Sequence, residues 1–245
     1  MKYFIFCVCF VIFISSFTIL GWARKQYVCY YESSSVQTTE LNILNMLDTL
    51  CYYTLRIYDS SGKLLYSTMS SLSSYESDAY QLHKLIGRGN YWGLVSVETD
   101  DDAFLIITAE YFVDDICISI DNVIEQIPPY DSNYWYWYGI YYVSLSPSNT
   151  GLIIMNPQWS SIEFMLRIYD ADGSRLISRT YTLSSRASHF FDISDLIGSG
   201  RSKWGIIDIR SSHPIAIACE YYQRGGGRLE IDNIVDYYGK TRRTY

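Results

Sequence analysis

The octet "LRIYDSSG" at Leu55–Gly62 returns as "LRIYDADG" at Leu166–Gly173, 111 residues further along the 245-residue chain. Sliding the chain by this interval aligns residues 27–89 with residues 138–200 without a gap, and 25 of the 63 paired positions are identical. This period is close to the commonest size of an independent domain and far above the roughly 20 to 50 residues of solenoid and propeller repeats. The sequence therefore predicts two homologous domains in tandem.

The duplication also predicts where the domains begin and end. The match continues after small shifts in register, so that "IDNVI" at 120–124 corresponds to "IDNIV" at 231–235. Between the copies lies "EQIPPYDSN" at 125–133, whose paired prolines and turn formers are typical of a short connection. We predict a first domain at 24–126, a linker at 127–137, a second domain at 138–238 and a basic tail at 239–245.

Hydrophobic periodicity within each copy indicates strands. Apolar residues alternate with polar ones or form short runs rich in Val, Ile, Tyr and Phe, and turn residues interrupt them roughly every 8 to 12 positions. About eight short strands without a full helix cannot cover a single sheet, so they are expected to form two sheets face to face, with a closed barrel as the alternative. We predict an all-β protein of two tandem antiparallel β-sandwiches. In strand number and size each copy resembles an immunoglobulin-like or fibronectin-like domain, although the Cys and Trp spacing of true immunoglobulin domains is absent.

Residues 1–23 are predicted to be a targeting segment. An apolar run of 18 residues from Tyr3 to Leu20 carries no charge and is followed by Arg24 and Lys25. Small residues suit a signal-peptidase cut after Ala23, whereas the length of the run is close to a bilayer span. The segment is either a cleaved signal peptide or a transmembrane anchor. In both cases we expect the rest of the chain to be extracytoplasmic, either secreted or held at the membrane.

Four cysteines follow this segment: Cys29, Cys51, Cys117 and Cys219. An even number of cysteines in an exported chain is compatible with disulfides. Three of them, however, align with apolar residues of the other copy, which favours buried free thiols over a repeated disulfide framework. A Cys29–Cys51 bridge is the alternative.

Two ionisable residues are kept in both copies, Arg56 and Glu110 in the first and Arg167 and Glu220 in the second. Their neighbours on each strand are apolar, so the two-residue period places these four side chains on outer faces. We predict cross-strand ion pairs between Arg56 and Glu110 and between Arg167 and Glu220. A ligand-binding pair is the alternative interpretation.

The sequence gives little support for catalysis. Nucleophile-elbow, HExxH and P-loop motifs are absent, and His83, His189 and His213 are not repeated between the copies. "TDDDA" at 99–103 and "DADG" at 170–173 resemble fragments of calcium loops but lack the full ligand set, which favours solvated turns. We predict a protein without enzyme activity, metal or cofactor. A carboxylate-based hydrolase is the least favoured alternative.

Aromatic residues are unusually frequent in the composition, with 25 Tyr and 6 Trp. The densest run is "YWYWYGIYY" at 134–142, where alternation buries one side of the strand and turns the other outward. Outward rings can stack on sugars or fill a protein interface, and an aromatic strand packed between the two domains is the alternative. The candidate binding residues are Trp135, Trp137 and Trp159, of which Trp159 aligns with Asp48.

Charge is divided unequally between the copies. Residues 27–124 carry 14 acidic and 4 basic side chains, whereas residues 138–235 carry 9 of each. The acidic first copy argues against nucleic acid or an anionic membrane surface as a partner. An acidic domain at one end and a basic tail at the other favour head-to-tail association, so a homo-oligomer is a further hypothesis.

Taken together, these patterns predict a non-enzymatic extracytoplasmic protein that serves adhesion, surface structure or protein binding. Its expected partner is a protein or glycan at the cell surface, and the membrane itself if residues 1–23 are retained. The alternative function is a carbohydrate-binding protein that uses exposed Trp and Tyr rings. Rings buried between the domains would favour a rigid structural role, and exposed rings in a groove would favour glycan binding.

Overall fold

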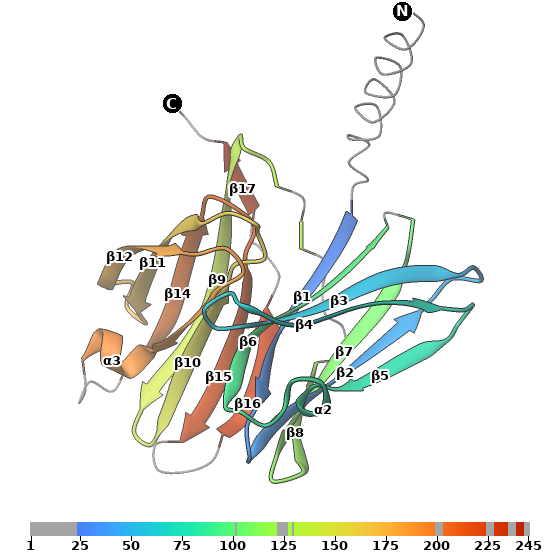
Figure 1. Cartoon of the computed structure of the whole chain (residues 1–245). Coiled ribbons are helices and arrows are strands. Elements are labelled where there is room, and N and C mark those ends of the chain that lie inside the picture. Colours follow the sequence, from blue (N-terminus) through green and yellow to red (C-terminus); the bar gives the residue numbers. More distant parts are fainter. Residues whose placement is uncertain are drawn as a thin grey trace, which may run out of the picture.

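The computed structural model describes residues 24–100, 102–121, 127–128, 130–198, 203–223, 228–234 and 239–242. The predicted signal or anchor segment, residues 1–23, lies outside the described residues. Within the described part, no helix is both long and apolar enough to cross a membrane. Among the described residues, the regular structure consists of antiparallel strands apart from two five-residue helices, α2 (Leu82–Ile86) and α3 (Ile193–Ile197) (Figure 1). The all-β prediction is confirmed.

The first module comprises eight strands in two layers. One layer has the order β4-β3-β6-β1 and the other contains β5, β2, β7 and β8, with β2 paired to both β5 and β7. The layers join where β1 turns into β2, through a single pairing of Ser33 with Thr38. The strands are β1 (Arg24–Ser33), β2 (Gln37–Asn45), β3 (Cys51–Asp59), β4 (Leu64–Leu72), β5 (Ser77–Gln81), β6 (Tyr91–Asp100), β7 (Leu105–Val113) and β8 (Ile116–Asp121).

The second module repeats this topology strand for strand and adds one strand at the end. Its layers are β12-β11-β14-β9, with β17 on the far side of β9, and β13, β10, β15 and β16. β17 lies within the predicted tail, and β9 begins within the predicted linker. The strands are β9 (Tyr134–Leu145), β10 (Ser148–Met155), β11 (Ile162–Asp170), β12 (Arg175–Leu183), β13 (Ser188–Asp192), β14 (Lys203–Ser211), β15 (Ala216–Gln223), β16 (Arg228–Ile234) and β17 (Gly239–Arg242).

The repeated octet builds the same hairpin in each module. Leu55 and Ile57 are fully buried in the core, and the intervening arginine points outward, as the two-residue period requires. The turn closes where the Gly62 N–H donates to the Asp59 carbonyl over 2.9 Å. Gly62 and Gly173 have φ of 89° and 85°, a left-handed conformation that favours glycine. Conservation of the octet between the copies therefore follows from the fold.

All four cysteines after the targeting segment are free thiols. Cys29, Cys51 and Cys219 are buried among apolar side chains, as their alignment with apolar residues indicated, and Cys117 is exposed. Burial raises the pKa of the Cys29 thiol. The structure therefore has no Cys29–Cys51 bridge and relies on packing rather than covalent links.

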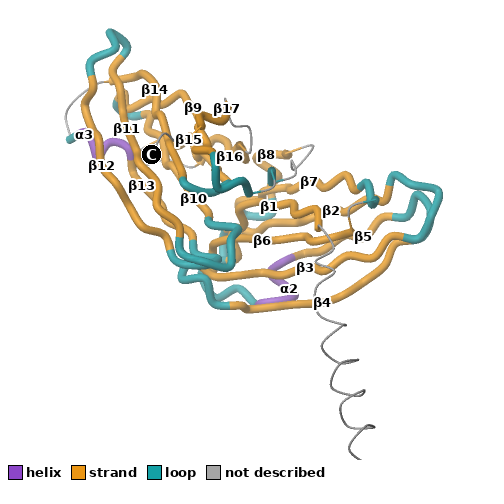
Figure 2. The backbone as a smooth tube through the Cα atoms, turned by 90° about the horizontal axis from the view of Figure 1, so that it is seen from above, coloured by secondary structure: helices purple, strands orange, loops and turns teal. Residues whose placement is uncertain are grey.

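The two modules pack directly against each other. Ile153, Met155, Ala216 and Ala218 of the second module are fully buried in the same apolar cluster as the core of the first module. They lie on the outer side of β10 and β15, because the alternate residues of these strands face the core of the second module. The seam thus forms where this outer side meets β1 of the first module, and β16 of the second module lies against β8 of the first (Figure 2).

Candidate interaction surface

Two kinds of sheet face meet at the seam. The docking face is defined as the outward side chains of β1, β3 and β6 in the first module, or of β9, β11 and β14 in the second. The receiving face is defined as the outward side chains of β2 and β7 in the first module, or of β10 and β15 in the second. Within the chain, the docking face of the first module packs on the receiving face of the second.

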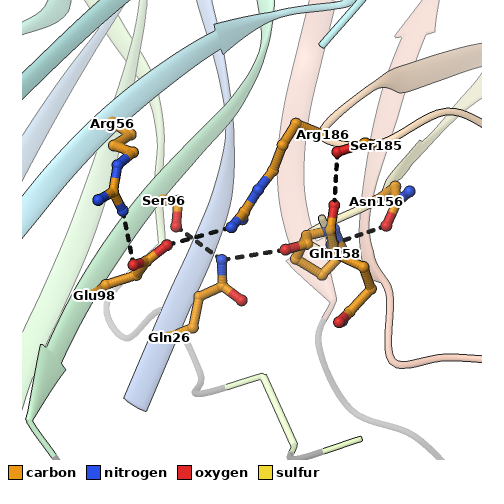
Figure 3. Close-up of polar contacts among 9 residues, drawn as sticks. Gln26, Arg56, Ser96, Glu98, Asn156, Gln158, Ser185 and Arg186 are labelled. Carbon is orange, nitrogen blue, oxygen red and sulfur yellow. Dashed lines mark hydrogen bonds and ion pairs between the residues drawn. The ribbon is translucent and has the colours of Figure 1, made fainter. Parts of the chain in front are cut away.

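A carboxylate whose side chain is only 10% exposed binds both modules at the edge of this seam. Glu98 on β6 pairs with Arg56 on β3, Nη1 to Oε2 at 2.7 Å, and with Arg186 of the second module, Nη2 to Oε1 at 3.3 Å (Figure 3). The Arg186 guanidinium carbon also lies 3.9 Å from the ring centroid of Trp159 and 5.4 Å from that of Tyr58. Burial lowers the pKa of Arg186, while Glu98 and Tyr58 act in the opposite direction. The guanidinium is therefore shared between a carboxylate and two rings.

Backbone and amide hydrogen bonds complete the seam. The Gln26 side-chain amide donates to Ser96 Oγ over 2.9 Å and to the Pro157 carbonyl over 3.3 Å. The Ser188 N–H of the second module donates to the Ser60 carbonyl of the first over 3.0 Å. The bonds to Pro157 and from Ser188 cross the seam and help to fix the orientation of one module on the other.

The turn that carries Gly62 makes the closest approach. A Cβ atom at Gly62 would lie 2.3 Å from the Ser185 carbonyl oxygen of the second module. The equivalent Gly173 has no atom within 4 Å of its would-be Cβ position. The same turn is thus in contact in one module and open in the other.

The docking face of the second module is not covered by any other part of the described structure. Tyr141 is 53% exposed, Trp204 50% and Ile206 57%. Tyr141 lies opposite Ile206 in the sheet, just as Tyr30 lies opposite Leu94 in the first module, so the positions are equivalent. Tyr30 and Leu94 are 2% and 0% exposed because the second module covers them. The exposed rings therefore occupy the positions that form the seam in the other copy.

Two of the three predicted tryptophans belong to this face. Trp135 and Trp137 lie half-buried on β9, on the same side as Tyr141. The Arg210 guanidinium carbon lies 4.5 Å from the Trp135 ring centroid, and that of Arg167 lies 5.2 Å from the Trp137 centroid. Each ring thus carries a guanidinium group over its face, which combines aromatic area with positive charge.

The third predicted tryptophan, Trp159, lies elsewhere. It follows β10 at the rim of the seam, is 67% exposed, and contacts Tyr58 edge-on with ring centroids 6.4 Å apart. The structure therefore separates it from Trp135 and Trp137. Of two surface depressions, both on the first module around Tyr52 and Thr99, neither is lined by a predicted tryptophan.

The predicted pairings of Arg56 with Glu110 and of Arg167 with Glu220 are wrong. The arginines lie on β3 and β11, whereas the glutamates lie on β7 and β15 in the opposite layer of each sandwich. Outward side chains of the two layers point away from each other, so they cannot meet. Glu110 instead accepts a hydrogen bond from Asn42 over 3.1 Å. The arginines pair with carboxylates one strand away in their own layer, at 2.7 Å and 2.5 Å: Glu98 and Asp208.

The calcium-like fragments have no common centre among the described residues. No group of three or more His, Cys, Asp and Glu side chains there could hold a metal ion. The fragment at 170–173 forms the hairpin turn described above, where Asp170 pairs with Lys203.

The sequence interpretation missed Tyr141, Trp204 and Ile206 as surface residues. A signal was present in the repeat, because outward positions of the receiving face differ in kind between the copies. Asn42 and Thr108 of the first copy are replaced in the second by apolar residues, Ile153 and Ala218. Such a replacement indicates that the receiving face of the second copy is covered by the docking face of the first. The docking face of the second copy is then the one that stays open.

Comparison with known proteins does not assign a family. No protein-family model and no curated protein matches the chain. Among solved structures it is similar to a glycosyl hydrolase family 2 member from Bacteroides cellulosilyticus DSM 14838, with 6% identity, TM-score 0.21, and coverage of 86% of this chain and 28% of that chain. It is also similar to a putative beta-galactosidase from Bacteroides fragilis (11%, 0.20, 86% and 32%) and to Pleurotus ostreatus lectin (8%, 0.22, 86% and 75%). The chain spans less than a third of either hydrolase, and similarity at this level carries no argument about function.

Proposed function

We propose that this is a non-enzymatic extracytoplasmic protein that serves adhesion, surface structure or protein binding, and that the docking face of its second module is the contact surface. One observation carries the proposal. Tyr141 and Ile206 are exposed at positions whose equivalents, Tyr30 and Leu94, are buried under a partner module. The second copy thus keeps a surface suited to burial that remains exposed among the described residues.

The composition of the face supports a protein partner. Burying a large apolar side chain fully stabilises a complex by about 1.5 to 3 kcal/mol, and Trp, Tyr and Arg are the residues most enriched at interface hot spots. Trp204, Tyr141 and Ile206 provide the apolar area, and Arg167 and Arg210 provide charge beside it. Contiguous exposed apolar area of this kind typically marks an interaction site.

Carbohydrate binding is less well supported. Sugar stacking requires an open ring face, yet guanidinium groups lie over the rings of Trp135, Trp137 and Trp159. The three rings also do not converge on one groove. These contacts favour a protein partner over a glycan.

Surface binding can be tested with matched variants. Labelled protein is added to cells of the native host, and saturable binding is measured for the wild type, for Trp204→Ser/Ile206→Ser, and for the control Phe104→Ser/Ile116→Ser, which removes two other exposed apolar side chains. We expect the first variant to bind about tenfold more weakly and the control to bind like the wild type. Equal binding by all three proteins would refute the assignment of the surface.

The extracytoplasmic location has its own test. Protein from the native host is fractionated and its N-terminus is sequenced. A start at Arg24 in the soluble fraction identifies a released protein, and an intact Met1 in the membrane fraction identifies a tethered one. Recovery of the intact chain in the cytosol would contradict the proposed location.

A further inference from the structure

We infer that the partner of this surface is a second copy of the same chain, whose first module presents its receiving face to the docking face of the second module. The inference rests on the proposed function and specifies its partner. Within the chain, the docking face of the first module and the receiving face of the second are buried against each other at the seam. The receiving face of the first module and the docking face of the second remain on the surface of the described structure. The two remaining faces are the equivalents of a pair already joined in this structure.

The equivalence extends to the backbone of the contact. In the first module Gln26 lies opposite Glu98, and in the second Trp137 lies opposite Arg210, so the docking faces share one register. The receiving faces also share a register, as shown by the Asn42–Thr108 and Ile153–Ala218 pairings. The shared register therefore allows a second chain to repeat the contact between the faces, with β17 beside β9 as the strand that the first module lacks.

The rim of the receiving face has the same backbone in both modules. Arg186, which pairs with Glu98 at the seam, has φ of 59°, and its equivalent Tyr75 has φ of 56°. Both residues are in the left-handed region of backbone conformation, which residues other than glycine rarely adopt. Tyr75 is 64% exposed and therefore available to a partner. The side chains of Arg186 and Tyr75 therefore leave the backbone at equivalent positions, from which each can reach a docking face.

The residues at this rim differ between the two copies on both sides of the contact. The docking face carries Glu98 in the first module and Arg210 in the second, while the receiving rim carries Arg186 in the second and Tyr75 in the first. An arginine at the first rim would have faced Arg210 with like charge. Tyrosine instead offers a ring for the guanidinium, so an ion pair within the chain corresponds to a cation–π contact between chains.

A second rim position, Trp159 in the second module and Asp48 in the first, also differs between the copies in a way that keeps the contact attractive. Trp159 lies near Arg56 at the seam, with the guanidinium carbon 5.9 Å from the ring centroid. The equivalent residues are Asp48 on the first module and Arg167 on the second. A cation–π contact within the chain thus corresponds to an ion pair between chains, and Asp48 is exposed. The two exchanges keep each contact attractive.

The receiving face of the first module combines acidic and polar side chains with an apolar pair. Its outward residues include Glu40, Asn42, Thr108 and Glu110, beside Leu44 and Ile106. The docking face opposite carries Arg210 among exposed rings. Permanent seams are apolar, whereas interfaces that open and close combine apolar and charged contacts. The charges of the two faces are complementary, which favours encounter and register.

The open turn at Gly173 is consistent with this arrangement. At the seam, the equivalent Gly62 approaches the Ser185 carbonyl so closely that a side chain would not fit. Gly173 has the same conformation and free space around it. In the proposed contact this space would receive the turn around Tyr75 of the next chain. Because the contact is heterologous, repeating it produces either a closed ring or an open filament.

A double-mutant cycle tests the contact. The full chain is studied in mild detergent by sedimentation velocity over a range of concentrations. We expect concentration-dependent oligomers for the wild type and an association about tenfold weaker for both single variants. Tyr75→Arg would face Arg210 with like charge, and Arg210→Glu would replace the cation–π contact with a carboxylate opposite the acidic first module. The double variant should regain association, because it recreates the pairing seen between Arg186 and Glu98. Arg179→Glu, an exposed arginine on β12, is the matched charge control and should behave like the wild type.

Two results would overturn the inference: a wild type that is monomeric throughout, or single variants whose loss is not restored in the double variant. The cell-binding experiment with Trp204→Ser/Ile206→Ser remains an independent readout. If that variant loses cell binding while the cycle fails, the surface binds a different protein and only the self-association is refuted. If both experiments fail, the proposed function is refuted as well.

Discussion

Replacing Gly62 with alanine is expected to damage the seam, and the equivalent change at Gly173 provides the control. Both glycines have φ near 90°, so alanine costs about 1 to 2 kcal/mol at either position for conformation alone. At Gly62 the new Cβ would additionally lie 2.3 Å from the backbone oxygen of Ser185, whereas at Gly173 it meets nothing within 4 Å. Overlap that forces packed backbones apart costs about 1 to 3 kcal/mol more. Gly62→Ala should therefore destabilise the protein by about 2 to 5 kcal/mol and Gly173→Ala by about 1 to 2 kcal/mol.

Two measurements check this difference at protein concentrations low enough to keep the chain monomeric. Denaturant unfolding gives the free energy of unfolding of each variant. Hydrogen exchange then reports on the Ser188 amide, which donates to the Ser60 carbonyl across the seam. We expect loss of protection at Ser188 in Gly62→Ala only. Equal destabilisation by the two substitutions, with Ser188 protected in both, would refute the close approach of the modules at this turn.

Three further predictions concern the seam and the second module. Glu98→Ala should lower the free energy of unfolding by about 3 to 5 kcal/mol because it strands the buried Arg186 charge, and the added change Arg186→Met should restore part of the loss in denaturant unfolding. Ile153→Asn should cost about 2 to 4 kcal/mol by burying an amide at the seam, whereas the reverse change Asn42→Ile on the exposed face should alter stability by less than about 0.5 kcal/mol. The pKa of Asp192 is lowered to about 2, since hydrogen bonds from neighbouring side chains outweigh the upward effect of burial. Its contribution to the free energy of unfolding is therefore present above the ordinary pKa of 3.8 and is lost as the pH falls through about 2. In acid titrations, Asp192→Asn should lose less of its stability over this range than the wild type. Identical titrations of the two proteins would contradict the assignment.

The repeat made the architecture predictable. Because Leu55 and Ile57 recur with the same alternation and the same glycine turn, the two-residue period was enough to predict strands, core and tandem sandwiches. The period identifies which side of a strand faces outward, but it does not identify the layer to which a strand belongs. The pairing of Arg56 with Glu110 failed for this reason, since the two outward sides belong to opposite layers.

The candidate surface was only partly predictable. Trp135 and Trp137 were found from aromatic density, whereas Tyr141 and Ile206 were missed because each is ordinary in a single copy. Their role follows from comparing exposure between the modules, which depends on how one sandwich packs on the other. That packing is a tertiary property, and its trace in the sequence is the exchange of Asn42 for Ile153 on the covered face.

The position of β1 has a mechanical consequence. β1 pairs with β6 in antiparallel register along its whole length, from Arg24 opposite Asp100 to Ser33 opposite Tyr91, and its outer side lies under the second module. A tether attached ahead of Arg24 would pull along the strand axis, perpendicular to its interstrand hydrogen bonds. All of those bonds would then resist the force at once, instead of breaking one after another. In the proposed arrangement in which residues 1–23 hold the chain at a membrane, this geometry would let β1 withstand traction.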